Sequence, residues 1–150
     1  MKTLVIDNSG EYTIPDAQRF DLKSARIHNC VGCWTCWWKT PGKCAYSDLE
    51  DFYRGYIAAD RVVIFEKPEN GFVSVKLKTL LDRAIPLFMP YTTFAEGGTW
   101  HEKRYPKYPD VTLYYDCDFD GTEDKSIFCD YIQKVFSQFL RKEHCSTSYF

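Results

Sequence analysis

Short, uninterrupted apolar runs along the chain predict buried β-strands. They lie at residues 3–6, 61–66 and 111–115, and each is rich in β-branched or aromatic side chains. Continuous apolar character over so few residues is typical of strands covered on both faces, as in a parallel sheet. A further strand is predicted at residues 19–22.

Apolar residues at helical spacing predict three amphipathic helices between and after these strands. The first follows the capping-box sequence of residues 47–50 and runs to about residue 58 or 59. The second begins with Ser74 as its cap and ends near Pro86. The longest follows Gly121, and its apolar stripe consists of Phe128, Tyr131, Ile132, Val135, Phe136, Phe139 and Leu140.

Alternation of strands and helices predicts an α/β three-layer sandwich with a doubly wound parallel sheet of about four strands. Residues 8–18 are too few for a helical crossover, so the first crossover helix is predicted to be missing. Residues 144–150 are expected to add at most a stub of a fifth strand. Residues 91–110, rich in Gly, Tyr and Pro, are predicted to form one long loop.

Composition limits the classes of function that this fold can serve. A chain of 150 residues with 45% hydrophobic content predicts one domain over residues 1–150. A formal net charge of -2, with scattered lysines and arginines, argues against a nucleic-acid partner. No apolar run reaches membrane-spanning length or resembles a signal peptide, so we expect a cytoplasmic protein.

Four of the seven cysteines lie in one short segment, at Cys30, Cys33, Cys36 and Cys44. The Cys-x2-Cys-x2-Cys spacing is typical of thiolates around an iron-sulfur cluster, and a turn at residues 41–42 can return Cys44 as the fourth ligand. These residues are therefore candidate ligands of a [4Fe-4S] cluster. Tetrahedral zinc, a disulfide from Cys30 or Cys33 to Cys44, and four reduced thiols packed among tryptophans are the alternatives.

The motifs over residues 29–116 resemble those of flavodoxin-like NAD(P)H-dependent FMN reductases, in particular the iron-sulfur flavoproteins. The similar elements are the cysteine segment, the Thr-Pro-Gly-x-Cys sequence at 40–44, and the Leu-Lys-x-x-x-Asp-Arg pattern at 77–83. The resemblance implies FMN at the carboxyl ends of the strands, reduced by a nicotinamide or a protein electron donor. The flavin contacts that it implies are Ser9, Pro68, Asn70, Gly71, Phe72 and Ser74. It also implies a homodimer, which the many aromatic residues favour.

Two departures from the family predict that FMN binds weakly or not at all. The loop after the first strand brings the carboxylates of Asp7 and Glu11 to the place where a phosphate is usually held, and the helix behind it is missing. The loop at 68–74 retains Phe72 as its one aromatic ring. The flavin site is therefore expected to be impaired.

Two functional hypotheses follow from these observations. The first is a redox protein that transfers electrons through a flavin, a cysteine-ligated cluster, or both. The second is a non-catalytic flavodoxin-like module for self-association or partner docking. No catalytic residue is assigned. Asp82 and Arg83 are interpreted as a local ion pair on a helix, and the resemblance implies an alternative role for Arg83 as a structural anchor of the long loop. His101 is a candidate proton donor or, with Arg104, a candidate contact to a nicotinamide phosphate, and a surface histidine without function is the alternative.

Overall fold

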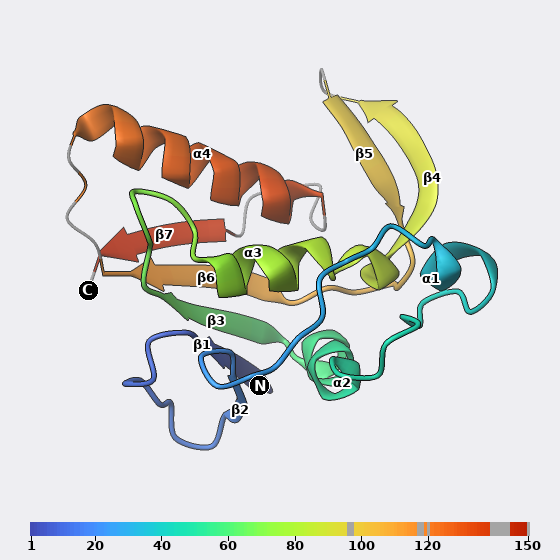
Figure 1. Cartoon of the computed structure of the whole chain (residues 1–150), viewed down its shortest axis with the longest axis horizontal. Helices are drawn as coiled ribbons and strands as arrows, with labels where there is room; N and C mark the ends of the chain where they lie inside the picture. Colours follow the sequence, from blue (N-terminus) through green and yellow to red (C-terminus); the bar gives the residue numbers. More distant parts are fainter. Residues whose placement is uncertain (96–97, 117–118, 120, 139–144, 150) are drawn as a thin grey trace.

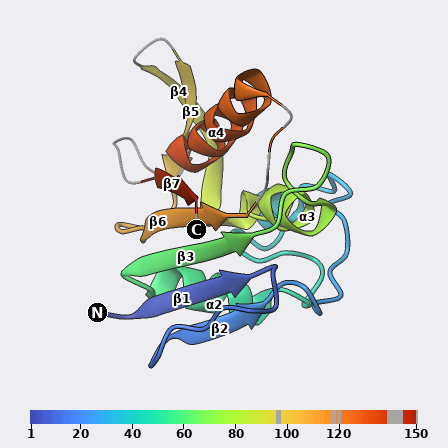
Figure 2. The same ribbon diagram turned by 90° about the vertical axis from the view of Figure 1, so that its left-hand side faces the viewer.

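The computed structural model of the chain describes residues 1–95, 98–116, 119, 121–138 and 145–149. Its main element is a parallel sheet with the strand order β2-β1-β3-β6-β7 (Figures 1 and 2). The strands are β1 (Thr3–Asp7), β2 (Gln18–Asp21), β3 (Arg61–Glu66), β6 (Asp110–Tyr115) and β7 (Cys145–Tyr149). From β1 the chain passes to β2 on one side, and from β3 it passes to β6 on the other, so the sheet is doubly wound.

The predicted fold class is confirmed, including the missing first crossover helix. No helix lies between β1 and β2, because residues 8–17 form an irregular connection in the described structure. Both faces of the central strands are covered, as their apolar runs predict. Leu4 on one face and Val5 on the other are each 1% exposed.

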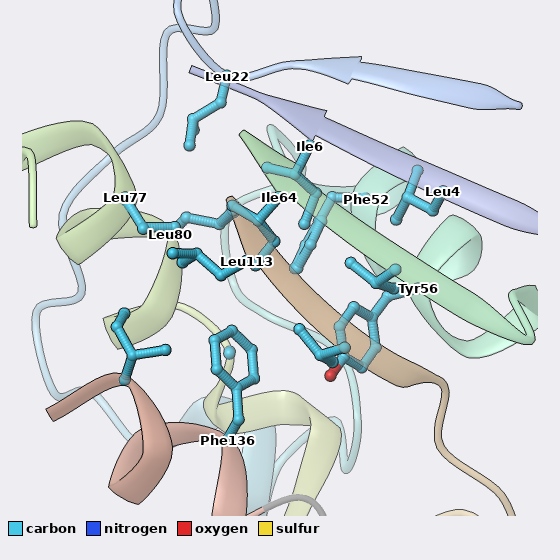
Figure 3. Close-up of a cluster of buried hydrophobic side chains, with 14 of the residues drawn as sticks. Leu4, Ile6, Leu22, Phe52, Tyr56, Ile64, Leu77, Leu80, Leu113 and Phe136 are labelled. Carbon is cyan, nitrogen blue, oxygen red and sulfur yellow. The ribbon is translucent and has the colours of Figure 1, made fainter. Parts of the chain in front are cut away.

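The helices are α1 (Thr35–Trp38), α2 (Glu50–Ala58), α3 (Val75–Asp82) and α4 (Thr122–Ser137), with a 3-10 turn at Ile85–Leu87. Apolar side chains of α2, α3 and α4 join side chains of the sheet in one buried cluster (Figure 3). The labelled residues of this cluster are Leu4, Ile6, Leu22, Phe52, Tyr56, Ile64, Leu77, Leu80, Leu113 and Phe136. Burial of this cluster is the main favourable contribution to folding.

Helix boundaries agree with the sequence at one cap and differ at another. The Ser74 hydroxyl accepts the Leu77 amide at 3.2 Å, as predicted for the cap of α3. The predicted capping box at Ser47 is wrong, because α2 begins at Glu50 after Leu49 and has no side-chain cap. Two members of the predicted stripe of α4, Phe139 and Leu140, lie outside the described residues.

Two predictions about strands are wrong. The fifth strand is no stub, because β7 pairs in parallel with β6 over five residue pairs. The segment 91–110 is not one loop, because β4 (Phe88–Ala95) and β5 (Gly98–Lys103) form an antiparallel hairpin. This hairpin extends beside α4, away from the main sheet (Figures 1 and 2). Its β-branched and aromatic residues favour strands, but Gly and Tyr content led the sequence interpretation to a loop.

Candidate functional site

Polar residues gather where the winding of the sheet reverses, at the carboxyl ends of β1 and β3. Ligands of doubly wound folds bind outside the strand ends at this position. Asp7 ends β1, Asn8 and Ser9 follow it, and Glu66 ends β3. All four are buried, and Asp7 and Glu66 have no exposed surface.

The Asp7 side chain accepts the hydrogen-bond donors of its own loop. Its Oδ1 accepts the Ser9 amide at 2.9 Å, the Ser9 hydroxyl at 2.6 Å and the Gly10 amide at 3.0 Å. Its Oδ2 accepts Arg19 Nη2 at 2.7 Å. Burial acts to raise the pKa of Asp7, but the bonds from Ser9 and Arg19 outweigh it and hold the pKa below its usual value. Asp7 is therefore a buried carboxylate with a full set of donors.

This arrangement decides whether the loop fits a flavin phosphate. The family's loop binds phosphate with backbone amides and hydroxyls. Here the amides of Ser9 and Gly10 and the hydroxyl of Ser9 already donate to Asp7. The loop after β1 does not fit a phosphate in this conformation.

A second buried network joins the end of β3 to the start of α3. Glu66 accepts the Ser74 amide at 2.7 Å through Oε1 and the Asn8 side-chain amide at 3.0 Å through Oε2. The same Asn8 amide donates to the Ser74 hydroxyl at 2.8 Å. Burial raises the pKa of Glu66 to about 7, and the bonds from Ser74 and Asn8 oppose this rise. Both the amide and the hydroxyl of Ser74, a predicted flavin contact, thus form hydrogen bonds that connect β1, β3 and α3.

The remaining predicted flavin contacts lie in a tight turn after β3. Asn70 and Gly71 have positive φ values of 52° and 72°, and Glu69 and Phe72 exchange backbone hydrogen bonds of 2.8 and 3.0 Å. Positive φ at both central positions is the signature of a type I′ turn, which Asn-Gly favours. Phe72 packs on Tyr131 of α4, with ring centroids 4.7 Å apart. Pro68 is buried beneath this turn.

The four clustered cysteines line one cavity of about 210 Å³. The remaining lining residues include Trp34, Trp37, Tyr46, Arg83 and Pro86. Lys43 donates its amide to the Thr40 carbonyl at 2.8 Å, and Gly42 has φ of 82°, so the predicted turn at 41–42 exists as a type II turn. This turn brings Cys44 back to the cavity.

The four cysteines of the motif, Cys30, Cys33, Cys36 and Cys44, are free thiols, which differs from the disulfide alternative. Cys30 and Cys33 are exposed, Cys44 is half-buried and Cys36 is buried. Burial, followed by the neighbouring Cys44 thiol, raises the pKa of Cys36 to about 11. In this conformation, no three His, Cys, Asp or Glu side chains of the described residues are close enough together to hold a metal ion.

A buried ion pair fixes the cysteine segment to the body of the protein. Arg83, which is 1% exposed, donates Nη2 to Asp48 Oδ1 at 2.6 Å and Nη1 to the His28 carbonyl at 2.6 Å. Burial acts to raise the pKa of Asp48, but donors from Arg83 and His28 hold it well below its usual range. The interpretation of Asp82 and Arg83 as a local ion pair is wrong, because Asp82 pairs with Lys78 at 2.5 Å.

One polar atom at this cavity has no partner. The Nε–H of Arg83 is buried and has no hydrogen-bond acceptor, although Arg83 lines the cysteine cavity. A buried donor without an acceptor is costly, and it commonly marks a site that a ligand or an ion completes.

Aromatic contacts attach the segment at its other end. The Trp37 indole N–H lies 3.1 Å from the Phe88 carbonyl, and its ring contacts His101 at 5.4 Å between centroids. His101 stacks on Phe88 at 4.5 Å, and Arg104 donates Nε to the Pro86 carbonyl at 3.0 Å. In this structure His101 packs against aromatic rings and Arg104 forms hydrogen bonds to the backbone. Trp34 and Trp38 are 55% and 78% exposed.

Sequence reasoning missed contacts made by four residues, Asp7, Asp48, Glu66 and Arg83. Glu66 was not singled out, and the pairing of Asp48 with Arg83 was not predicted. Asp7 was recognised as unfavourable to phosphate, but not as the acceptor for its own loop. An acidic residue at the end of an apolar strand, as at both Asp7 and Glu66, was the available signal.

No protein-family model matches this chain. It is similar to an iron-sulfur flavoprotein of Methanocaldococcus jannaschii, with 34% identity over 68 residues that cover 45% of this chain and 34% of that protein. The match thus spans about a third of the relative's length.

Solved structures share the fold over nearly the whole chain. An azoreductase from Bacillus anthracis aligns with a TM-score of 0.63 and 10% identity, covering 99% of this chain and 86% of that one. An FMN-dependent NADH-azoreductase from the same species, in complex with FMN, aligns with a TM-score of 0.56 and 13% identity, covering 99% and 85%. The resemblance to flavodoxin-like FMN reductases and iron-sulfur flavoproteins is therefore confirmed, in fold across the chain and in sequence over part of it.

Proposed function

We propose that this chain is a flavodoxin-like redox protein whose cysteine segment binds a [4Fe-4S] cluster. The observation that carries the proposal is the cavity lined by all four cysteines of the motif. Cys30, Cys33, Cys36 and Cys44 would be the ligands, and the cluster would supply one-electron transfer. The partial match to an iron-sulfur flavoprotein supports the same site.

The surroundings of the cavity suit a group that carries negative charge. Four thiolates concentrate negative charge, and Arg83 places a buried cation with a spare N–H beside them. Trp37 and Pro86 contribute apolar walls. The tight spacing of the first three cysteines favours a cluster over zinc, which commonly takes separated pairs. In the described conformation the thiols must still move together before they bind a metal.

A flavin redox function is proposed on the basis of the fold and the relatives. One structural neighbour is an FMN-dependent enzyme seen with FMN, and the sequence relative is a flavoprotein. Because the loop after β1 does not fit a phosphate, Pro68, Asn70 and Gly71 are the proposed contacts to a flavin ring. A nicotinamide or a protein donor would supply the electrons.

Anaerobic reconstitution with iron and sulfide tests the cluster. The wild type is expected to take up about four iron atoms per chain, and the double variant Cys33→Ser/Cys36→Ser far fewer. Cys129→Ser is the matched control, since Cys129 is a half-buried cysteine outside the motif. Equal iron uptake by the wild type and the double variant would end this proposal.

The visible spectrum of protein purified without oxygen separates the two hypotheses. Flavin bands, a broad cluster absorption, or both would support a redox protein. A colourless protein that stays colourless after reconstitution and flavin addition would instead favour the non-catalytic docking module. Free thiols at Cys30, Cys33, Cys36 and Cys44 are consistent with the proposed cytoplasmic location, where thiols remain reduced.

We also propose that the protein forms a homodimer. Large aromatic side chains are exposed on the cysteine segment and on β4, including Trp38 at 78%, Tyr91 at 69% and Phe94 at 78%. Aromatic residues are enriched at protein interfaces. Light scattering at micromolar concentration should report a dimer, and a monomer throughout this range would contradict the proposal.

A further inference from the structure

We infer that the Asp7 carboxylate takes the place of the flavin phosphate, so that this protein recognises a flavin without using its phosphate at the loop after β1. The choice of flavin as ligand rests on the proposed function. The occupation of the loop by Asp7 does not depend on it.

The donors around Asp7 are those that an external anion would need. Two backbone amides, one hydroxyl and one guanidinium converge on a single carboxylate at 2.6 to 3.0 Å. Charge-assisted hydrogen bonds of this kind are the strong ones in proteins. The loop thus contains an anion site, and its anion is a side chain of the same chain.

The position of this site agrees with the substitution of one anion by another. Asp7 is the last residue of β1, beside β3, where the winding reverses. The Gly10 residue that donates to it is exposed, with φ of 82°. Arg19 is partly exposed, at 35% for its side chain. An anion that replaced the carboxylate would therefore reach these donors from solvent.

The nearby cationic side chains, Arg19 and Lys23, already have hydrogen-bond or ion-pair partners when Asp7 is present. Arg19 bonds Asp7 and lies 3.7 Å from Asp21. The Lys23 ammonium donates to the Ser9 carbonyl at 2.8 Å. A phosphate dianion approaching the wild-type loop would meet the Asp7 charge and no free amide donor from Ser9 or Gly10. FMN should then bind no more tightly than riboflavin.

The Asp7→Ala variant tests the inference with inorganic phosphate as the probe. Removing the carboxylate frees the Ser9 and Gly10 amides and the Arg19 guanidinium. In amide NMR spectra, the Ser9 and Gly10 resonances of the variant should shift on addition of phosphate. The phosphate concentration that saturates this shift should be at least about tenfold lower for the variant than for wild type. Asp21→Ala is the matched control, because it removes the same charge from the other acidic neighbour of Arg19.

Two further measurements keep the test decisive. Asp7→Asn retains an acceptor for the Ser9 and Gly10 amides, so it should open the loop less than Asp7→Ala. Thermal unfolding of each variant establishes that the loop is compared in folded protein. A folded Asp7→Ala variant whose Ser9 and Gly10 resonances ignore phosphate would overturn the inference, as would equal shifts in the Asp21→Ala control.

Flavin titration then separates this inference from the proposed function. Wild type should bind FMN no more tightly than riboflavin, while Asp7→Ala should favour FMN by about tenfold. A strong preference of the wild type for FMN would overturn the inference. If no variant binds either flavin, the flavin function fails, and the phosphate response still decides the role of Asp7.

Discussion

The carboxyl end of β1 and the cysteine segment are two candidate sites that differ in how far their polar groups are satisfied. At the first, Asp7, Asn8, Glu66 and Ser74 are buried and hydrogen-bonded to one another or to the loop between them. At the second, four free thiols surround a cavity, and the Arg83 Nε–H has no acceptor. At the first site, which we call the closed site, the polar groups are satisfied by hydrogen bonds within the protein. The second, which we call the open site, has a cavity and an unpaired donor that a ligand or an ion could complete.

This difference shows why resemblance in fold does not carry a binding site with it. The position at which relatives of this fold bind their ligand is retained, but its donors serve the folded structure. Buried donors that have acceptors stabilise the fold, whereas a buried donor without one points to a missing partner. The cysteine cavity is therefore a stronger candidate for a binding site than the carboxyl end of β1.

The largest effect is expected from removing the cation that anchors the cysteine segment. Arg83→Met would leave the Asp48 carboxylate without its buried partner and should lower the free energy of unfolding by about 3–5 kcal/mol. Urea denaturation measures this change. Arg54→Gln, which breaks the exposed pair with Glu50, is the control and should cost at most about 0.5 kcal/mol. A loss below about 1 kcal/mol for Arg83→Met would mean that the open site is not held by this pair.

A smaller, pH-dependent effect is expected at the closed site. Because the pKa of Glu66 rises from 4.5 to about 7 in the folded protein, its contribution to stability is present at low pH. That contribution is lost as the pH rises through the folded pKa, since ionising a buried carboxyl costs free energy. The stability of wild type relative to Glu66→Gln should fall by about 3 kcal/mol between about pH 4.5 and 7.5.

Urea denaturation at several pH values gives this difference directly. Asp130→Asn provides the control, because Asp130 is exposed on α4, and its curve should run parallel to that of wild type. If wild type and Glu66→Gln lose stability in parallel across this range, Glu66 is already ionised at low pH. The closed network would then tolerate a charge that its burial argues against.

The smallest effect compares a cap that forms with one that does not. Ser74→Ala removes the hydroxyl that caps α3 and accepts from Asn8, and it should cost about 1 kcal/mol, within the usual range of 0.5–2 kcal/mol. Ser47→Ala should cost less than about 0.5 kcal/mol, because α2 has no side-chain cap. Thermal or urea unfolding of both variants tests the pair, and equal losses would show that the predicted capping box operates after all.

The sequence by itself determined strands β1, β2, β3 and β6, helices α2, α3 and α4, and the missing crossover. These features follow from local causes: apolar runs fix β1, β3 and β6, and residues 8–17 are too few for a helix. Cysteine spacing and the Pro41-Gly42 turn are also local, and the four cysteines of the motif line one cavity. Their predicted convergence on a cluster stays a prediction, because no three ligand-type side chains of the described residues are close enough together to hold a metal ion.

Only the tertiary structure decided which polar groups find partners. Arg83 and Asp48 are separated by 35 residues, and Glu66 and Asn8 by 58, so no local pattern reveals these pairs. The β4–β5 hairpin was missed because its strands pair only with each other, outside the main sheet. The role of Asp7 was hidden for a related reason. Whether a carboxylate repels an anion or replaces it depends on where the chain turns its amides, and that is fixed by the packing of β1 against β2 and β3.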